Sequence, residues 1–100
     1  MIRFQRSLRA VAGKGREATA WAQEVTDYLN RKFEDTRLQV FTHRFGDINT
    51  LTWQADFDSL ASLDTFQQAV NRDQDYWKLV DKTDGLFMED SIHDTVLESL

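Results

Sequence analysis

The chain has 100 residues, of which 41% are hydrophobic and 29% are charged, and it contains no cysteine. This length and balance predict one globular domain over residues 1–100. The lack of cysteine excludes disulfides, thiolate metal ligands and cysteine nucleophiles. No apolar run approaches the roughly 20 residues that cross a bilayer. The first residues alternate in polarity instead of forming a signal sequence. We therefore expect a cytoplasmic protein without a membrane partner.

Charge is distributed unevenly along the chain. Residues 1–50 carry nine Lys/Arg and six Asp/Glu, whereas residues 51–100 carry three and eleven, so the halves stand at +3 and −8 and the chain at −5. Binding to phosphate backbones needs clustered cations, and the acidic half would repel such a polyanion. We therefore expect no nucleic-acid partner and interpret most carboxylates as a hydrated surface.

Residues 2–11 predict the first strand, because apolar and polar side chains alternate there with only Arg6 out of step. A flexible Gly-Lys-Gly connection follows at residues 13–15. The spacing then predicts a helix from about Arg16 to Phe33, because apolar residues recur three and four positions apart on one stripe. The stripe consists of Ala18, Trp21, Ala22, Val25, Leu29 and Phe33.

Residues 37–45 and 48–58 predict a hairpin that turns at Gly46 and Asp47, because glycine takes the positive φ of a two-residue turn. Phe45 then lies opposite Ile48. The remaining pairs are Val40 with Trp53, Thr42 with Leu51, Leu38 with Ala55, Phe41 with Thr52, His43 with Thr50, and Gln39 with Gln54. This single register sorts both strands into an apolar face and a polar face.

A second helix is predicted after the capping residues Asp58, Ser59 and Ser62, with a break near Asp73. Its apolar stripe is Leu63, Phe66, Val70, Trp77 and Val80. Gly85 ends this region, and residues 91–98 predict a last strand whose faces the pattern does not assign. The order β-α-β-β-α-β predicts an α+β, ferredoxin-like fold with both helices on one face of a four-stranded antiparallel sheet.

Helices on one face leave the other face of the sheet open. The side predicted to lie under the helices is apolar: Ile2, Phe4, Leu8, Leu38, Val40, Leu51, Trp53, Ala55 and Phe57. The open side is mixed: Gln5, Ser7, Arg9, Phe41, His43, Thr50, Thr52 and Gln54. Such a face suits either solvent or a face-to-face homodimer whose two sheets enclose a partly polar cavity.

Three features resemble the dimeric α/β-barrel superfamily, which includes antibiotic-biosynthesis-monooxygenase-like and NIPSNAP-like domains. They are the element order, the Gly13-Lys14 step before the first helix, and the segment WQADFDSL at residues 53–60. Asp75-Tyr76-Trp77 also resembles the acidic-aromatic step late in the family's second helix. The resemblance covers nearly the whole chain and implies dimers formed through the open faces. Members include cofactor-free quinone-forming monooxygenases, haem-degrading enzymes, isomerases and domains without an assigned activity.

Two departures restrict what the resemblance implies. Several members have a histidine in the first turns of the second helix, where this chain reads Thr-Phe-Gln at residues 65–67. The haem-degrading branch needs a helix histidine as axial ligand, whereas His43 and His93 lie in predicted strands. Haem degradation is therefore disfavoured, and we expect no cofactor.

His43 is the candidate catalytic residue, because histidine side chains titrate near neutral pH and this one lies on the predicted cavity face. Arg9 and Arg3 could pair with an anionic group of a ligand in a two-pronged geometry. The candidate ligand-binding residues are Arg9, Phe41, Thr50, Thr52 and Gln54. A solvated or interface histidine and solvated arginines remain the alternatives.

Other features are interpreted as structural. All three tryptophans fit the apolar stripes and are predicted to lie in the core. Residues 13–15 lack the full pattern of a phosphate-binding loop. His43 and His93 lack metal-ligand spacing, so no metal site is expected.

Three hypotheses of function remain open. The first is a cofactor-independent monooxygenase-like or isomerase-like enzyme that acts on a small aromatic or polyketide-like molecule in the cavity. The second is a non-catalytic small-molecule-binding domain, and the third is a structural dimeric domain. The fold alone does not choose among them.

Overall fold

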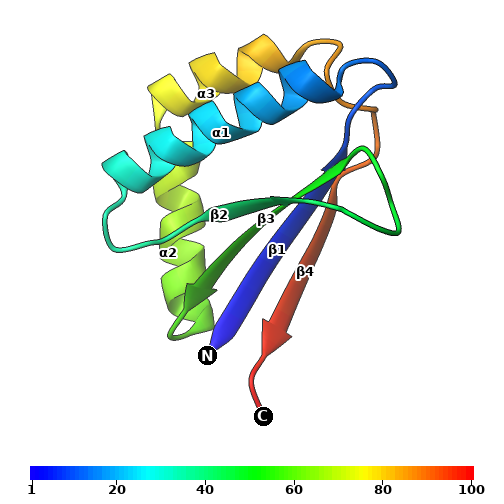
Figure 1. Cartoon of the computed structure of the whole chain (residues 1–100). Helices are drawn as coiled ribbons and strands as arrows, with labels where there is room; N and C mark the ends of the chain where they lie inside the picture. The colour runs from blue at the N-terminus through cyan, green and yellow to red at the C-terminus, as the bar shows by residue number, and fades with distance from the viewer.

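The computed structural model describes residues 1–100 (Figure 1). Its elements, in chain order, are β1 (Ile2–Arg9), α1 (Gly15–Lys32), β2 (Gln39–Thr42), β3 (Thr50–Phe57), α2 (Leu60–Asn71), α3 (Gln74–Val80), the short 3₁₀ helix η1 (Asp81–Thr83) and β4 (His93–Glu98). None of the helices combines the length and the apolar character that a membrane crossing requires.

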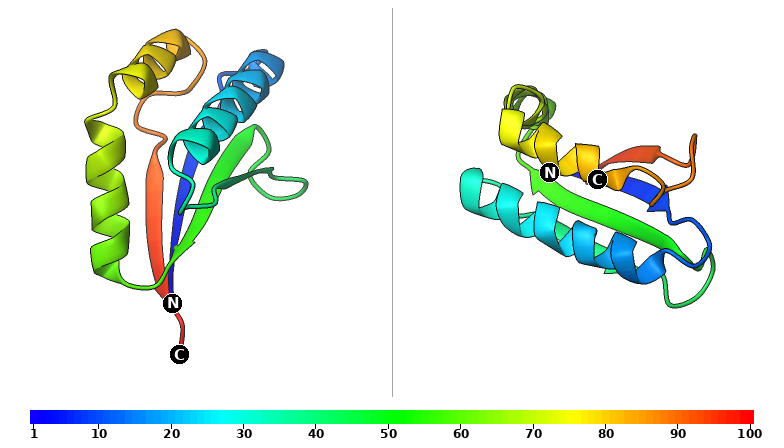
Figure 2. Two further views of the ribbon diagram at one scale, coloured as in Figure 1. Left: turned by 90° about the vertical axis from the view of Figure 1, so that its left-hand side faces the viewer. Right: turned by 90° about the horizontal axis from the view of Figure 1, so that it is seen from above.

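The four strands form one antiparallel sheet in the order β2-β3-β1-β4. The helices lie on one face of this sheet (Figure 2). Helix α1 contacts β2, α2 contacts β1 and β3, and α3 packs against α1 and α2. The predicted α+β, ferredoxin-like arrangement is therefore confirmed, and the second face of the sheet is left open.

The central strands β1 and β3 pair along their whole length, from Ile2 opposite Phe57 to Arg9 opposite Thr50. Successive side chains of a strand point to opposite faces. The apolar set predicted to lie under the helices is confirmed: Ile2, Leu38, Leu51, Trp53, Ala55 and Phe57 are buried, and Phe4, Leu8 and Val40 pack against them. The alternation that defines one face as core therefore defines the other face as open.

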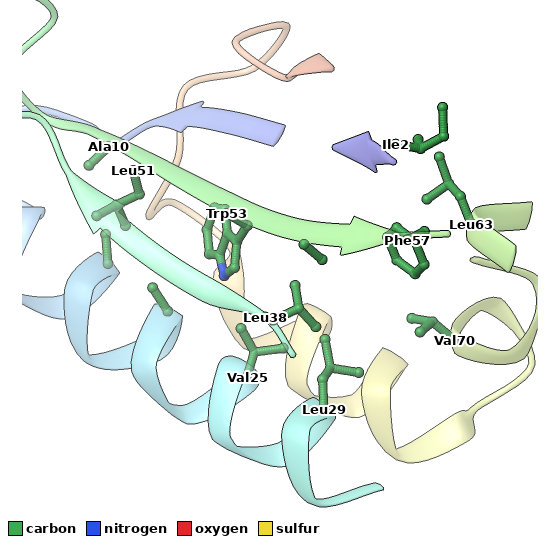
Figure 3. Close-up of a cluster of buried hydrophobic side chains, with 13 residues drawn as sticks. Ile2, Ala10, Val25, Leu29, Leu38, Leu51, Trp53, Phe57, Leu63 and Val70 are labelled. Carbon is green, nitrogen blue, oxygen red and sulfur yellow. The ribbon is translucent and has the colours of Figure 1, made fainter. Parts of the chain in front are cut away.

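Trp53 lies in the layer between β3 and α1 (Figure 3). Its indole Nε1 donates to Thr26 Oγ1 at 3.0 Å, so the buried N–H is not left without a partner. The ring of Trp21 packs edge-on against that of Trp53, with the ring centroids 6.1 Å apart. Trp21 Nε1 donates to the Leu79 carbonyl at 2.7 Å. Trp21 and Trp53 therefore pack in the core as predicted.

The hairpin has the predicted register and a different turn. Gln39, Val40, Phe41 and Thr42 lie opposite Gln54, Trp53, Thr52 and Leu51. The predicted two-residue turn is wrong, because residues 43–49 form a longer loop and Phe45 is 84% exposed instead of pairing with Ile48. Asn49 takes a positive φ (68°), outside the extended region, so β3 begins only after this residue. Gly46 still takes the positive φ (+85°) expected of it.

The second helical region is broken where the sequence predicts a break. Asp73 caps α3 by accepting a hydrogen bond from the backbone N–H of Asp75, and the Tyr28 hydroxyl donates to the same carboxylate at 2.7 Å. The break resets the helix rotation, so Tyr76 and Leu79 pack against the core. Trp77 is 45% exposed, and its predicted core position is wrong.

The structure assigns the faces of β4, which the sequence pattern left open. His93, Thr95 and Leu97 lie opposite Ser7, Gln5 and Arg3 and therefore share the open face. Asp94 lies on the helix side, where Arg6 donates to it through Nε and one terminal nitrogen at 2.7 and 2.8 Å. The misfit of Arg6 in the β1 pattern is thereby explained, because β4 is an edge strand and its helix side remains partly exposed.

Candidate functional site

The candidate site is the open face of the sheet, and its residues lie in rows that cross the strands. One row consists of Phe41, Thr52, Ser7 and His93, and the next consists of Gln39, Gln54, Gln5 and Thr95. Phe41 is 46% exposed, so an aromatic surface lies beside uncharged hydrogen-bonding groups. Ionic groups flank these rows, at Arg3 and Asp56 on one side and at Arg9 on the other.

A continuous hydrogen-bonded chain runs on this face from the residue after β2 across β3 to β1. His43 Nε2 lies 2.7 Å from Thr52 Oγ1, and Thr52 Oγ1 lies 2.7 Å from Ser7 Oγ. All three side chains are half-buried. The histidine tautomer sets the direction of donation, and these distances fit donation in either direction along the chain.

His43 is positioned by backbone and side chain together. It follows the last residue of β2, and its backbone N–H donates to the Thr50 carbonyl at 3.3 Å, so the hairpin register persists for one more residue. Its side chain then reaches Thr52 on β3. The imidazole is therefore held over the sheet instead of following the exposed loop that begins beside it.

Two polar pairs extend the site along β1 and β3. Gln5 Nε2 donates to Gln54 Oε1 at 2.9 Å. Arg3 donates to both Asp56 carboxylate oxygens at 2.8 and 3.1 Å. This two-pronged hydrogen bond lowers the pKa of Asp56 below its ordinary value and raises that of Arg3. The polar groups of the face are thus bonded to each other across the strands.

The structure brings the predicted site residues together on one face of the sheet and places Arg9 at its margin, opposite Thr50. Phe41, Thr52, Gln54 and His43 form the centre of the face, and Thr50 is buried at its margin. Arg9 is exposed, and its guanidinium lies 3.6 Å from the Asp47 carboxylate in the 43–49 loop. The Arg9 guanidinium therefore faces the hairpin loop, and no side-chain hydrogen bond joins it to the chain of His43, Thr52 and Ser7.

Sequence reasoning missed the partnership of Ser7 with Thr52 and the presence of His93 on the same face. Ser7 is on the predicted open side, but its contact depends on the β1–β3 register, which no turn specifies. The alternation of β4 is too weak to orient His93. Pairing the apolar residues of β1 against those of β3 is the signal that could have located Ser7.

The side-chain chemistry of the site is that of neutral polar recognition and proton transfer. It offers the imidazoles of His43 and His93, three hydroxyls, three amides and an aromatic ring, with charged pairs only at its margins. No group of three or more His, Asp or Glu side chains lies close enough to hold a metal ion. Such a surface can bind an uncharged or weakly polar ring system and exchange a proton with it.

No family model matches the sequence, and no curated protein matches it. Solved structures of similar fold do exist. An uncharacterized NIPSNAP domain protein from Burkholderia xenovorans superposes with a TM-score of 0.84 at 16% identity, covering 100% of this chain and 95% of the other. A NIPSNAP family protein from Agrobacterium tumefaciens gives 0.82 at 17% identity, covering 99% and 92%.

A third similar structure is described as an antibiotic biosynthesis monooxygenase. It superposes with a TM-score of 0.72 at 11% identity and covers 100% of this chain and 99% of the other. Identities this low establish a shared fold and leave the chemistry open. The chain therefore has the ferredoxin-like fold of NIPSNAP domain and antibiotic-biosynthesis-monooxygenase-like proteins.

Proposed function

We propose that two copies of the chain associate through their open sheet faces and that the enclosed space binds a small aromatic or polyketide-like molecule. The supporting observation is the chain of short hydrogen bonds from His43 through Thr52 to Ser7, beside the exposed ring of Phe41. Polar groups that are already bonded to each other can leave water at low cost. This face can therefore be covered by a second sheet without losing its internal contacts.

In the enzymatic form of this proposal, His43 is the general base. Its imidazole accepts a proton from an acidic C–H or O–H of the bound molecule, while Thr52 holds the ring in place. In a monooxygenase-like reaction, dioxygen is the second substrate: one oxygen atom enters the molecule, and the other leaves as water with two hydrogens from the substrate. In an isomerase-like reaction, the proton returns to a different atom of the same molecule. Neither reaction requires a cofactor.

Sedimentation velocity and native mass spectrometry of the freshly purified protein test the assembly. We expect a dimer, and a copurified small molecule would appear as added mass on it. A monomer at all concentrations would contradict the enclosed cavity and the role of His43 within it.

Oxygen uptake with anthrone tests the chemistry, because anthrone is an aromatic ketone with an acidic methylene C–H and is converted by dioxygen to anthraquinone and water. We expect His43→Ala to abolish the protein-dependent rate while the dimer persists. Thr42→Ala is the matched control, because Thr42 is the neighbouring residue on the other side of β2 and is exposed. An unchanged rate in His43→Ala would remove His43 from the mechanism.

One observation favours a second candidate function, non-catalytic binding. His43 Nε2 is already engaged by Thr52, an arrangement that also fits an imidazole that only orients a ligand. This hypothesis predicts that anthraquinone raises the melting temperature, because a ligand that binds only the folded state adds stability by mass action. It also predicts no oxygen uptake with anthrone in the same preparation.

A further inference from the structure

A cleft lies away from the hydrogen-bonded chain of the open face. It has a volume of about 800 Å³ and lies between the end of α1, with residues 33–36 after it, and the side of α2 from Ala61 to Ala69. The carboxyl end of β3 closes its base, at Asp56, Phe57 and Asp58. In Figure 1 this is the region where the last turn of α1 comes near α2. The volume lies within the range of about 300 to 1,000 Å³ that is typical of small-molecule sites.

The floor of the cleft is aromatic. The Phe33 ring meets the Phe66 ring edge-on with centroids 5.7 Å apart, and Phe66 in turn lies 5.5 Å from Phe57. Phe57 is buried, whereas Phe33 and Phe66 are half-buried and present apolar surface to the cleft. The wall contributed by α2 carries small side chains, including Ala61 and Ala69, that leave this floor accessible.

The rim of the cleft is acidic. Four carboxylates line it, from Glu34, Asp35, Asp56 and Asp58, against one cation, from Lys32. The Lys32 ammonium lies 3.9 Å from the carboxylate of Asp73, which is outside the cleft, and Asp56 is neutralised by Arg3. No salt bridge or side-chain hydrogen bond engages the other three carboxylates. The rim thus carries unneutralised negative charge above an apolar floor.

We propose that this cleft binds a small organic cation, an ammonium ion with an aryl or alkyl body. The body would lie on the rings of Phe33 and Phe66, whose faces also attract cations. The ammonium would pair with Glu34 and Asp35. Asp58 lies at the base of the cleft, one residue before Ser59, the N-cap of α2. The opposite charges of ligand and rim select against anions with the same body.

Two probes of equal shape and opposite charge test the selection. The full chain, labelled with ¹⁵N, is titrated with 4-phenylbutylammonium and, separately, with 4-phenylbutanoate, and amide shifts are followed by NMR. We expect saturable shifts confined to residues 33–36 and 58–69 with the ammonium, and at least tenfold weaker binding of the carboxylate. Equal affinity for both probes, or no saturation with the ammonium at millimolar concentration, would overturn the proposal.

Paired variants test the residues. Glu34→Gln/Asp35→Asn should weaken ammonium binding at least fivefold, whereas Glu89→Gln/Asp90→Asn removes two exposed carboxylates in the loop before β4 and should change it less than twofold. Equal weakening in both variants would indicate general charge attraction and would contradict the site. Thr65→Trp, which places a large ring in the cleft, should block binding while the circular dichroism spectrum is unchanged.

Dilution of the unliganded protein distinguishes a ligand site in the cleft from an interface with a second copy of the chain. If the same amides shift with protein concentration alone, a second copy covers the cleft and the cation proposal is wrong. A failure of this site leaves the open-face proposal untouched, because the two share no residue among His43, Thr52 and Ser7.

Discussion

The two faces of β3 show two ways of stabilising one strand. On the helix side, Leu51, Trp53, Ala55 and Phe57 are buried beneath the helices. On the open side, Thr52, Gln54 and Asp56 each form a side-chain hydrogen bond with the residue opposite on β1. The first face derives its stability from area removed from water, and the second from pairwise polar contacts that remain near water and are individually weak.

The two faces therefore differ in how much change each can tolerate. The helix side can change little, because its side chains fill a close-packed layer. The open side has an ordered geometry that does not depend on helices, so it can hold His43 in place and still admit a partner or ligand.

Removing one aromatic ring from each face should give the clearest difference in stability between the two faces. We expect Trp53→Ala to lower the free energy of unfolding by about 3–5 kcal/mol, because it leaves a cavity in the core and also removes the bond to Thr26. Phe41→Ala, on the exposed side of β2, should cost less than about 1 kcal/mol in dilute solution. Urea denaturation measures both. A cost for Phe41→Ala that grows with protein concentration would show that the open face is covered by a second copy.

A polar contact in the helix layer should be worth more than one on the open face. The Asp73 side chain is 6% exposed, and the hydrogen bond from Tyr28, with the backbone N–H groups at the start of α3 and Lys32, lowers the pKa of Asp73. We expect Asp73→Asn to cost about 1 kcal/mol at pH 7, through the weakened cap and the lost charge.

The pH dependence of this variant follows from the direction of the shift. A carboxyl whose folded-state pKa is lowered stabilises the fold above its unfolded pKa, near 3.9, and the stabilisation is lost as the pH falls through the folded value. The wild-type chain should therefore lose more stability than Asp73→Asn between pH 6 and pH 2. The same hydrogen bond raises the pKa of Tyr28 to about 12. In Asp73→Asn the pKa of Tyr28 should fall toward its ordinary value of about 10, which absorbance at 295 nm measures. Identical acid profiles for the two proteins would contradict the role of Asp73.

The hydrogen-bonded chain of the open face should contribute less. Thr52→Val keeps the shape of the side chain but removes the partner of both His43 and Ser7. Because these groups are half-buried, water can replace part of the lost bonding, and we expect a cost of about 1 kcal/mol or less. Thermal unfolding measures it, with Thr95→Val on β4 as the matched control, since Thr95 forms no side-chain hydrogen bond. A loss above about 2 kcal/mol would mean that this face is buried in the native assembly.

The smallest effect is expected where the two faces are least distinct, at the helix side of β4. Arg6 and Asp94 form a two-pronged pair that lowers the pKa of Asp94, but both side chains remain more than a third exposed, so solvent screens the attraction. A double-mutant cycle with Arg6→Met and Asp94→Asn should give a coupling of at most about 1 kcal/mol that decreases with added salt. A coupling that is larger and insensitive to salt would show that a partner covers this edge.

Residue patterns were sufficient where a local period determines structure. The apolar stripe of α1 and the shared register of β2 and β3 follow from spacing alone, because a shift of one residue would expose an entire apolar set. The break before α3 followed from the polar run at residues 71–75, which contains the capping residue Asp73. The candidate site was predictable in part for the same reason, since Thr52 and Gln54 alternate with core residues and the hairpin register places Phe41 and His43 on their side.

Residue spacing was enough to predict the order of the elements, the covered face of the sheet and most members of the open face, because burial imposes periods of two and 3.6 residues on the chain. Which of these residues meet is set by the packing of the whole fold. The Ser7–Thr52 and Arg3–Asp56 pairs, the face of His93 and the exposure of Trp77 depend on contacts between segments far apart in sequence. No local pattern encodes such contacts, because they arise only when strand registers and helix rotations are set by packing the whole core at once.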